Sequence, residues 1–313
     1  MRIYFIFALN ILNNASNLAA RVMLPLLAIK LGATPVVVGV VGAAFAVVPA
    51  FLAVVAGRLN DRFGSRYLIV FGTLATAIGL LLPAFWPSMA AIFAAALLSG
   101  FSQVFCNLST QNLTGLLSTP ETRARNFSNY ALCNSTGQFF GPVLGGFALE
   151  HLPDSEACLA LAAFTTLPIF VLMARRAPLE PRHAPSRNKE KKAAAAQAGG
   201  AWAMLKDREV RRTLYSGSIH NSSGNLFMFY MPVYAHSPGI SASSIGLIMA
   251  AQASAAFVVR MVLPRLIKEF KEDKSLAMAF SVGACALILV PFFQNVWMLG
   301  LLSFLFGLGM GIG

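Results

Sequence analysis

The chain has 313 residues, of which 57% are hydrophobic and only 12% are charged. Soluble domains average about half apolar and a quarter charged residues, so this composition excludes an ordinary soluble domain and indicates a membrane protein. The formal net charge of +12 could suggest a nucleic-acid partner. The basic residues are not interleaved with aromatic ones, however, and membrane topology accounts for them, so no nucleic-acid partner is expected.

Long intervals without charge predict the membrane spans in chain order, because a helix needs about 20 apolar residues to cross the hydrocarbon core. The expected spans lie at 3–20, 31–57, 67–120 (two spans with a turn at 85–88), 126–149, 157–174, 213–259 (two spans split near 236–244) and 275–313 (a ninth span, a turn at 294–295 and the start of a tenth). The strands of a membrane barrel would be only about 10 residues long and would alternate in polarity, so these longer apolar intervals indicate helices. The predicted fold class is therefore all-α, a polytopic membrane protein.

The distribution of basic residues orients the bundle. If the N-terminus is cytoplasmic, 22 of the 24 Lys and Arg residues fall on the cytoplasmic side, and only Arg21 and Lys30 do not. This is the asymmetry of the positive-inside rule. We therefore expect a multi-pass, monomeric protein of a bacterial-type inner membrane, with the lipid bilayer as its surroundings.

A linker and an internal repeat divide the chain into an N-terminal half at 1–175, a basic linker at 176–212 and a C-terminal half at 213–313. The linker is rich in Pro, Lys and Ala and is typical of a solvated tether, which we favour over a membrane-surface helix near its end. A shift of 207 residues aligns eight positions of the halves, and they fall at helix ends and turns: Asn14/Asn221, Pro25/Pro232, Gly32/Gly239, Gly39/Gly246, Arg58/Arg265, Leu59/Leu266, Phe63/Phe270 and Gly100/Gly307. Two parallel six-helix-type halves are a known transporter architecture.

Two motifs carry a resemblance to a known family. The decapeptide GRLNDRFGSR at 57–66 interrupts two apolar runs, and GQFFGPVLGG lies in the fifth span. The first resembles the signature loop of the major facilitator superfamily at Gly57, Asp61, Arg62, Gly64 and Arg66. The second resembles the pattern of the exporter branches of that family at Gly137, Gly141, Pro142, Gly145 and Gly146.

Both motifs also have a physical interpretation. Gly57 and Gly64 would permit a tight turn, and a contact of Asp61 that exists in only one conformation would bias a two-state equilibrium. The resemblance implies that this loop is a latch; the alternative is a loop that only sets topology. The glycines of the fifth span would allow close helix packing, and Pro142 would bend the helix. The resemblance favours a gate there over plain tight packing.

Polar side chains recur at helical spacing inside several predicted spans, where buried polar groups require partners or water. We expect them to line a shared central cavity that binds the substrate; the alternative is hydrogen bonding between helices. The candidates are Asn14, Asn17, Arg21, Gln103, Asn107, Gln111, Asn134, Gln138, Asn221, Asn225 and Gln252.

The predicted function is secondary transport of a small, largely apolar molecule by alternating access, in the direction of efflux. No acidic residue lies within a predicted span, so proton coupling is not supported, and His220 is interpreted as a packing residue. Four scattered cysteines show no metal-ligand spacing, so we expect no metal, no cofactor and no enzyme activity. The alternative is a non-transporting scaffold or receptor, or an inactive carrier fragment. Because Gly313 aligns with Cys106 in the middle of a span, we also expect the second half to be incomplete.

Overall fold

The computed structural model describes residues 2–174, 208–236 and 239–312, and helices make up nearly all of these residues. The elements are α1 (Arg2–Lys30), α2 (Pro35–Phe63), α3 (Ser65–Phe85), α4 (Met89–Leu116), α5 (Pro120–His151), α6 (Asp154–Ala174), α9 (Arg208–His236), α10 (Ala242–Leu289), the 3-10 helix η1 (Val290–Phe292) and α11 (Val296–Ile312). The described part of the chain contains no strand, which confirms the predicted all-α class.

Five of the described helices are long and apolar enough to cross a membrane by length and composition alone: Ile3–Lys30, Pro35–Phe63, Ser65–Phe85, Met89–Leu116 and Ala242–Val259. The expected turns at 85–88, 236–244 and 294–295 are present. Several helices extend beyond the apolar intervals, because polar residues continue the helix outside the hydrocarbon core. For example, α9 begins at Arg208, whereas the seventh span was predicted to begin near residue 213.

The decapeptide 57–66 is mostly helical, which corrects the expected loop. Gly64 alone separates α2 from α3, with φ of 83°, and its N–H donates to the carbonyl of Asn60. Glycine adopts this left-handed conformation without the penalty that a Cβ imposes. Gly57 lies inside α2 rather than in a turn, so its predicted role in the turn is wrong; a Cβ there would lie 4.0 Å from Leu108 Cδ2.

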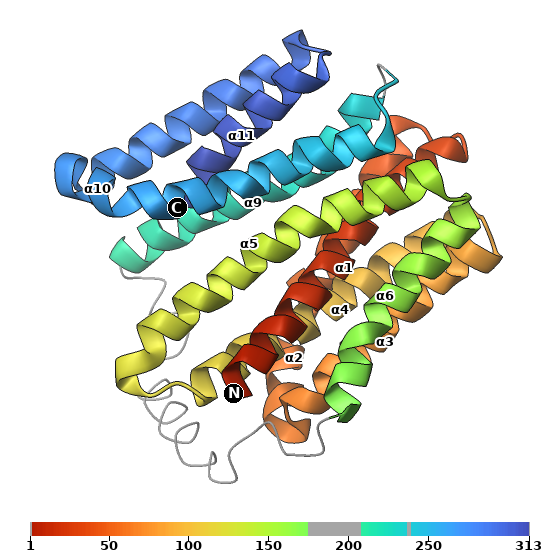
Figure 1. Ribbon diagram of the computed structural model, residues 1–313, viewed down its shortest axis with the longest axis horizontal. Helices are drawn as coiled ribbons and strands as arrows, with labels where there is room; N and C mark the ends of the chain where they lie inside the picture. The colour runs from red at the N-terminus through yellow and green to blue at the C-terminus, as the bar shows by residue number, and fades with distance from the viewer. Residues whose placement is uncertain (1, 175–207, 237–238, 313) are drawn as a thin grey trace.

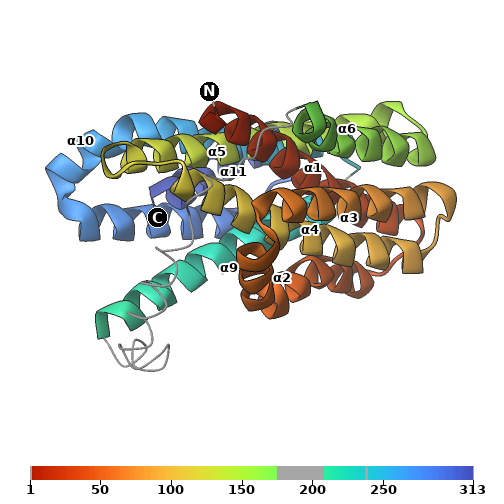
Figure 2. The same ribbon diagram turned by 90° about the horizontal axis from the view of Figure 1, so that it is seen from below.

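The 48-residue helix α10 folds back on itself, as Figures 1 and 2 show. Gly307 of α11 packs against Ala255, while Gly283 packs against Gly309, two residues further along α11. Because 28 helical residues would span about 42 Å in a straight helix, Ala255 and Gly283 can both reach α11 only if α10 reverses. Its two arms correspond to the predicted eighth and ninth spans.

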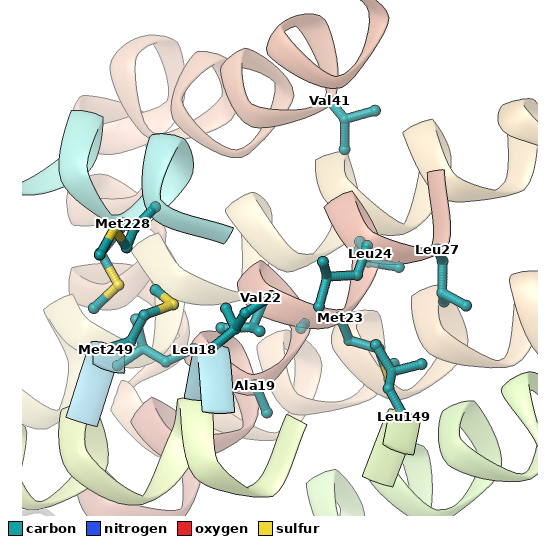
Figure 3. Close-up of a cluster of buried hydrophobic side chains, with 14 of the residues drawn as sticks. Leu18, Ala19, Val22, Met23, Leu24, Leu27, Val41, Leu149, Met228 and Met249 are labelled. Atoms are coloured by element: carbon teal, nitrogen blue, oxygen red, sulfur yellow. The ribbon is translucent and has the colours of Figure 1, made fainter. Parts of the chain in front are cut away.

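The helices form two groups, α1–α6 and α9–α11. Within the first group, α5 lies on the side that faces the second group (Figure 1). We call the side on which α1 begins the N-terminal face and the other side the opposite face. The largest apolar core joins both groups and includes Leu24 of α1, Val41 of α2, Met231 of α9, Ile248 of α10 and Leu302 of α11. Figure 3 shows part of it, where Met228 and Met249 approach Leu18.

Toward the N-terminal face the two smaller apolar clusters belong to the first group alone. One contains Ile6, Leu9, Ile69, Leu113 and Leu172, and the other contains Ala56, Leu68 and Phe105. Among the side chains that the structure describes, which leave out 260–277 of α10, the two groups of helices share a core near the opposite face, and the clusters near the N-terminal face belong to the first group.

The internal repeat is visible in the backbone. The shift of 207 residues carries the start of α2 at Pro35 onto the start of α10 at Ala242, and the start of α4 at Met89 onto that of α11 at Val296. The paired Gly32 and Gly239 have φ of 82° and 81°. The two groups are thus built on the same helical plan.

Candidate functional site

The glycine motif of α5 packs against two other helices, α1 and α10. Three glycines face α1, because a Cβ added there would lie 2.8 Å from Asn14 Cβ at Gly137, 2.7 Å from the Ala15 carbonyl oxygen at Gly141 and 2.7 Å from the Ala19 carbonyl oxygen at Gly145. Real Cβ atoms do not approach backbone oxygens this closely, so the two helices can meet only with glycine at these positions. The spacing of four residues that the sequence displays is therefore a packing face toward α1.

The rest of the motif joins the two groups of helices. Gly146 meets the carbonyl of Ala242, and Gly246 of α10 meets the carbonyl of Pro142, so the two backbones touch. One helical turn further on, the Glu150 carboxylate accepts a hydrogen bond of 2.7 Å from the backbone N–H of Ser243 in the first turn of α10. These contacts hold the groups together at the opposite face.

The residues predicted as a latch lie at the N-terminal face. Asp61 and Arg62 are exposed in the last turn of α2, and the Arg62 guanidinium lies over the ring of Phe63. Arg66 donates a hydrogen bond of 3.1 Å to the carbonyl of Leu172 near the end of α6. This cationic cap on the last carbonyls of a neighbouring helix was not expected from the sequence.

A polar cavity of about 370 Å³ lies between the two groups of helices. Its walls come from α1, α4, α5, α9, α10 and α11. On α9 most lining residues precede the residues of the shared core and on α11 they follow them, whereas on α1 the two sets overlap, because Leu18 belongs to both and Arg21 lies between core residues. The cavity therefore lies between the shared core and the N-terminal face.

Nine of the eleven predicted cavity residues line this space: Asn14, Arg21, Gln103, Asn107, Asn134, Gln138, Asn221, Asn225 and Gln252. Gln111 lines a second cavity of about 450 Å³, which shares Arg21, Gln103 and Asn107 with the first. Asn17 is not part of either wall. It is buried, and its Nδ2 donates 3.0 Å to the Asn13 carbonyl within α1, so its predicted place on the cavity is wrong.

Arg21 occupies the centre of the site. Its Nη1 donates to Asn225 Oδ1 at 2.9 Å and its Nη2 donates to Gln103 Oε1 at 2.6 Å. The guanidinium carbon lies 5.5 Å from the centre of the Phe45 ring. Arg21 thus links α1 to α4 in the first group and to α9 in the second.

Hydrogen bonding between helices also occurs, as the alternative interpretation of the polar residues expected. Asn10 Nδ2 donates to Asn134 Oδ1, and Asn14 Nδ2 donates to the Asn134 carbonyl, each at 2.8 Å. A second network was missed: Asn13 Oδ1 accepts from Thr73 at 3.0 Å, and Cys106 lies beside both. The only sequence signal for this network is that Asn13 lies on a different side of the helix from Asn10 and Asn14.

The lining also contains residues that were not predicted. Ser135, Met228 and Met310 lie on the wall, together with His220, which the sequence had suggested to be a packing residue. Gln252 Oε1 and His220 Nδ1 are buried atoms without a hydrogen-bond partner. Buried polar atoms are normally paired, so both mark places where a ligand or water can bind.

No carboxylate lines either cavity in the part of the chain that the structure describes. The acidic side chains that can be placed lie at helix ends: Asp61, Glu121, Glu150, Asp154 and Glu156. The same residues include no cluster of three His, Cys, Asp or Glu side chains that could hold a metal ion. Hydrogen bonding and the charge of Arg21 are therefore the chemistry that these walls offer.

The chain is similar in sequence to several characterised proteins, including the following two. The chain is 31% identical over 135 residues to the Multidrug efflux pump LfrA of Mycolicibacterium smegmatis, a match that covers 43% of this chain and 27% of the relative. It is 30% identical over 113 residues to Multidrug resistance protein 1 of Bacillus subtilis, covering 36% of this chain and 29% of the relative. The chain thus spans less than a third of the length of these relatives.

Two solved structures share the fold at low sequence identity. The nucleoside transporter NupG superposes with a TM-score of 0.75 at 12% identity, over 99% of this chain and 80% of that one. The peptide transporter POT in complex with sulfate gives 0.70 at 18% identity, over 99% and 80%. The family profile described as Major Facilitator Superfamily matches residues 3–313. The chain therefore belongs to the Major Facilitator Superfamily.

Proposed function

We propose that the chain moves a small molecule across the membrane by alternating access and that it works in the direction of efflux. The observation that carries this proposal is the polar cavity, which lies between two groups of helices whose described side chains share a core on one side of it. Such an arrangement supports a state that is closed at the opposite face, and the repeated architecture supports a second state with the opposite opening. The names of the two relatives support export.

The proposal requires the Glu150–Ser243 contact, at the end of the α5–α10 interface, to break during each cycle. Glu150 and Ser243 are in direct contact across this interface. A disulfide between E150C and S243C, in a chain without its four native cysteines, should therefore stop flux, and reduction should restore it. The measurement is the flux of labelled organic anions, cations and neutral compounds across proteoliposome membranes.

A matched control lies on the same face. Lys30 and Asp154 form an ion pair between α1 and α6, within the first group of helices. A K30C/D154C pair joined by a short bifunctional thiosulfonate should leave flux unchanged, because alternating access moves the groups and not their interiors. Full flux through the oxidised E150C/S243C chain would exclude the proposed movement and would favour the non-transporting scaffold or receptor.

The latch is a second part of the proposal. Asp61 lies at the N-terminal face, where none of the described core clusters joins the two groups, so a contact made there in the other state would help to close that face. We expect D61N to insert normally and to lower flux, and E156Q on the opposite face serves as the control. Equal flux in D61N at equal expression would leave the decapeptide as a determinant of topology.

A further inference from the structure

We propose that the central cavity binds a small organic anion that also carries a hydrogen-bond donor, with Arg21 as the group that holds its negative charge. This inference rests on the proposed function, because it names the class of substrate for the same cavity. It differs from the largely apolar substrate that the sequence suggested.

The first observation is the charge of the cavity. Arg21 is hydrogen-bonded to two neutral amides, Asn225 and Gln103, and stacked near the neutral ring of Phe45. No Asp or Glu among the described residues lines any of the three cavities that Arg21 borders. Arg21 is half-buried at the wall of an open cavity, and a guanidinium that loses part of its hydration without gaining a counter-ion is destabilised. A bound anion would offset this destabilisation at the place where the walls provide no carboxylate.

The second observation is the geometry of the guanidinium. The described hydrogen bonds use two of its five N–H groups, one on each terminal nitrogen. Gln103 and Asn225 fix its plane from two different helices. The N–H groups that these amides leave can donate to the two oxygens of a carboxylate, sulfonate or phosphate group, which is the pairing that a planar guanidinium favours.

The third observation concerns the donor on the ligand. The Gln252 side chain is 9% exposed, lines the cavity and has an oxygen without a partner. As the amide is placed, its oxygen meets no hydrogen-bond donor within the described residues. A hydroxyl or N–H group on the ligand would satisfy the oxygen, and this donor would lie on the α10 side of the cavity, away from α1.

The fourth observation is the size and remaining lining of the cavity. A volume of about 370 Å³ lies at the small end of ligand pockets. Leu18, Met228 and Met310 complete the wall with apolar side chains, and thioethers adapt to different shapes. The ligand is therefore an organic anion with an apolar body rather than a bare inorganic ion.

The test is equilibrium binding to the purified full chain in detergent at low ionic strength. The probes are salicylate, benzenesulfonate and phenyl phosphate, with uncharged salicylamide as the matched control for salicylate. We expect saturable binding of at least one anion, and we expect salicylate to bind at least tenfold more tightly than salicylamide. R21Q should weaken anion binding at least tenfold, R21K should weaken it less than R21Q because an ammonium keeps the charge but not the two-pronged donor geometry, and K30Q should leave it unchanged.

A second variant keeps the test sharp if R21Q folds poorly. N225D retains Arg21 and the shape of its partner but adds a carboxylate beside the guanidinium, so anion binding should fall at least tenfold. Equal affinity for salicylamide and salicylate, anion binding by R21Q within twofold of the native chain, or no saturable binding of any of the three anions would each overturn the inference. Because binding is measured without flux, these outcomes are distinct from failure of the disulfide experiment, which tests transport.

Discussion

The two copies of the repeat use the same glycine in different ways. In the first copy a Cβ at Gly39 of α2 would meet nothing within 4 Å, whereas in the second copy the equivalent Gly246 of α10 lies against the backbone of α5 at Pro142. The copies share a helical plan, but the contact between the groups uses only one member of the pair. Repetition in the sequence therefore predicts geometry better than it predicts interfaces.

Another pair of glycines is used in the same way in both copies. Gly100 of α4 packs on the carbonyl of Phe45, and Gly307 of α11 packs on the carbonyl of Gln252. All four residues are related by the shift of 207 positions. This pair belongs to the interior of each copy, where the same two helices meet, and the contrast with Gly39 and Gly246 separates internal packing from contacts between copies.

The largest expected effect tests the unequal pair. G246V places a branched side chain against the backbone of α5, and overpacking of this kind costs about 3 kcal/mol at the upper end of its usual range. G39V adds the same atoms to open space and should change stability by less than about 0.5 kcal/mol. Thermal unfolding in detergent measures both variants. Equal losses of Tm would mean that Gly39 is also packed and that the contrast between the copies is wrong.

The second prediction concerns the equal pair. A Cβ at Gly100 would lie 2.7 Å from the Phe45 carbonyl oxygen, and one at Gly307 would lie 2.7 Å from Ala255 Cβ. G100A and G307A should therefore destabilise the chain by similar amounts, about 1–3 kcal/mol each, as measured by the loss of Tm. A loss in one variant only would show that the interiors of the two copies are packed differently.

The third prediction uses the turns that precede α2 and α10. Gly32 and Gly239 both have positive φ, and neither would bring a Cβ within 4 Å of another group. G32A and G239A should each cost about 1 kcal/mol, because only backbone strain opposes the methyl group. Chemical denaturation of the two variants provides the measurement. An effect well above this value would reveal packing around the turn rather than strain.

The smallest effect is expected at the starts of the same two helices. Thr34 makes no side-chain hydrogen bond to the start of α2, whereas Ser241 and Glu150 both accept hydrogen bonds from the first turn of α10. E150Q should reduce stability by about 0.5 kcal/mol or less, as is usual for an exposed charge near a helix start. The Glu150 carboxyl group lies outside the predicted membrane span 126–149.

This contact also predicts a pH dependence. The backbone N–H of Ser243 hydrogen-bonds the charged carboxylate and lowers the pKa of Glu150 from its usual value of 4.5. The carboxylate therefore adds stability above about pH 4.5, and this contribution disappears as the pH falls through the lowered pKa. The difference in Tm between the native chain and E150Q should vanish in that acidic range. A difference that persists there would point to a role other than the charge.

The sequence predicted the helical class, the turns and most of the cavity, because charge-free length and helical periodicity act within single helices. The sequence placed Asn17 on the cavity because a helical face inferred from spacing also includes residues about 60° around the axis from Asn14. In the structure, Asn17 instead donates to the Asn13 carbonyl within its own helix. The roles of His220 and Met310 depend on how α9, α10 and α11 assemble, which no single-helix pattern contains. The cap of Arg66 on α6 joins residues 106 positions apart, and no local pattern indicates such a partner.

The crossing of α5 and α10 has a mechanical consequence. The backbones touch near Pro142, which is 22 residues from the start of α5 at Pro120, a distance of about 33 Å along the helix. If the crossing serves as a fulcrum, α5 is a lever with a short arm at the opposite face and a long arm at the N-terminal face. A rotation of about 10° would then displace the far end by about 6 Å over that length, while atoms at the fulcrum would hardly move. Glycine at such a point removes the side chains that would otherwise interlock and resist the rotation.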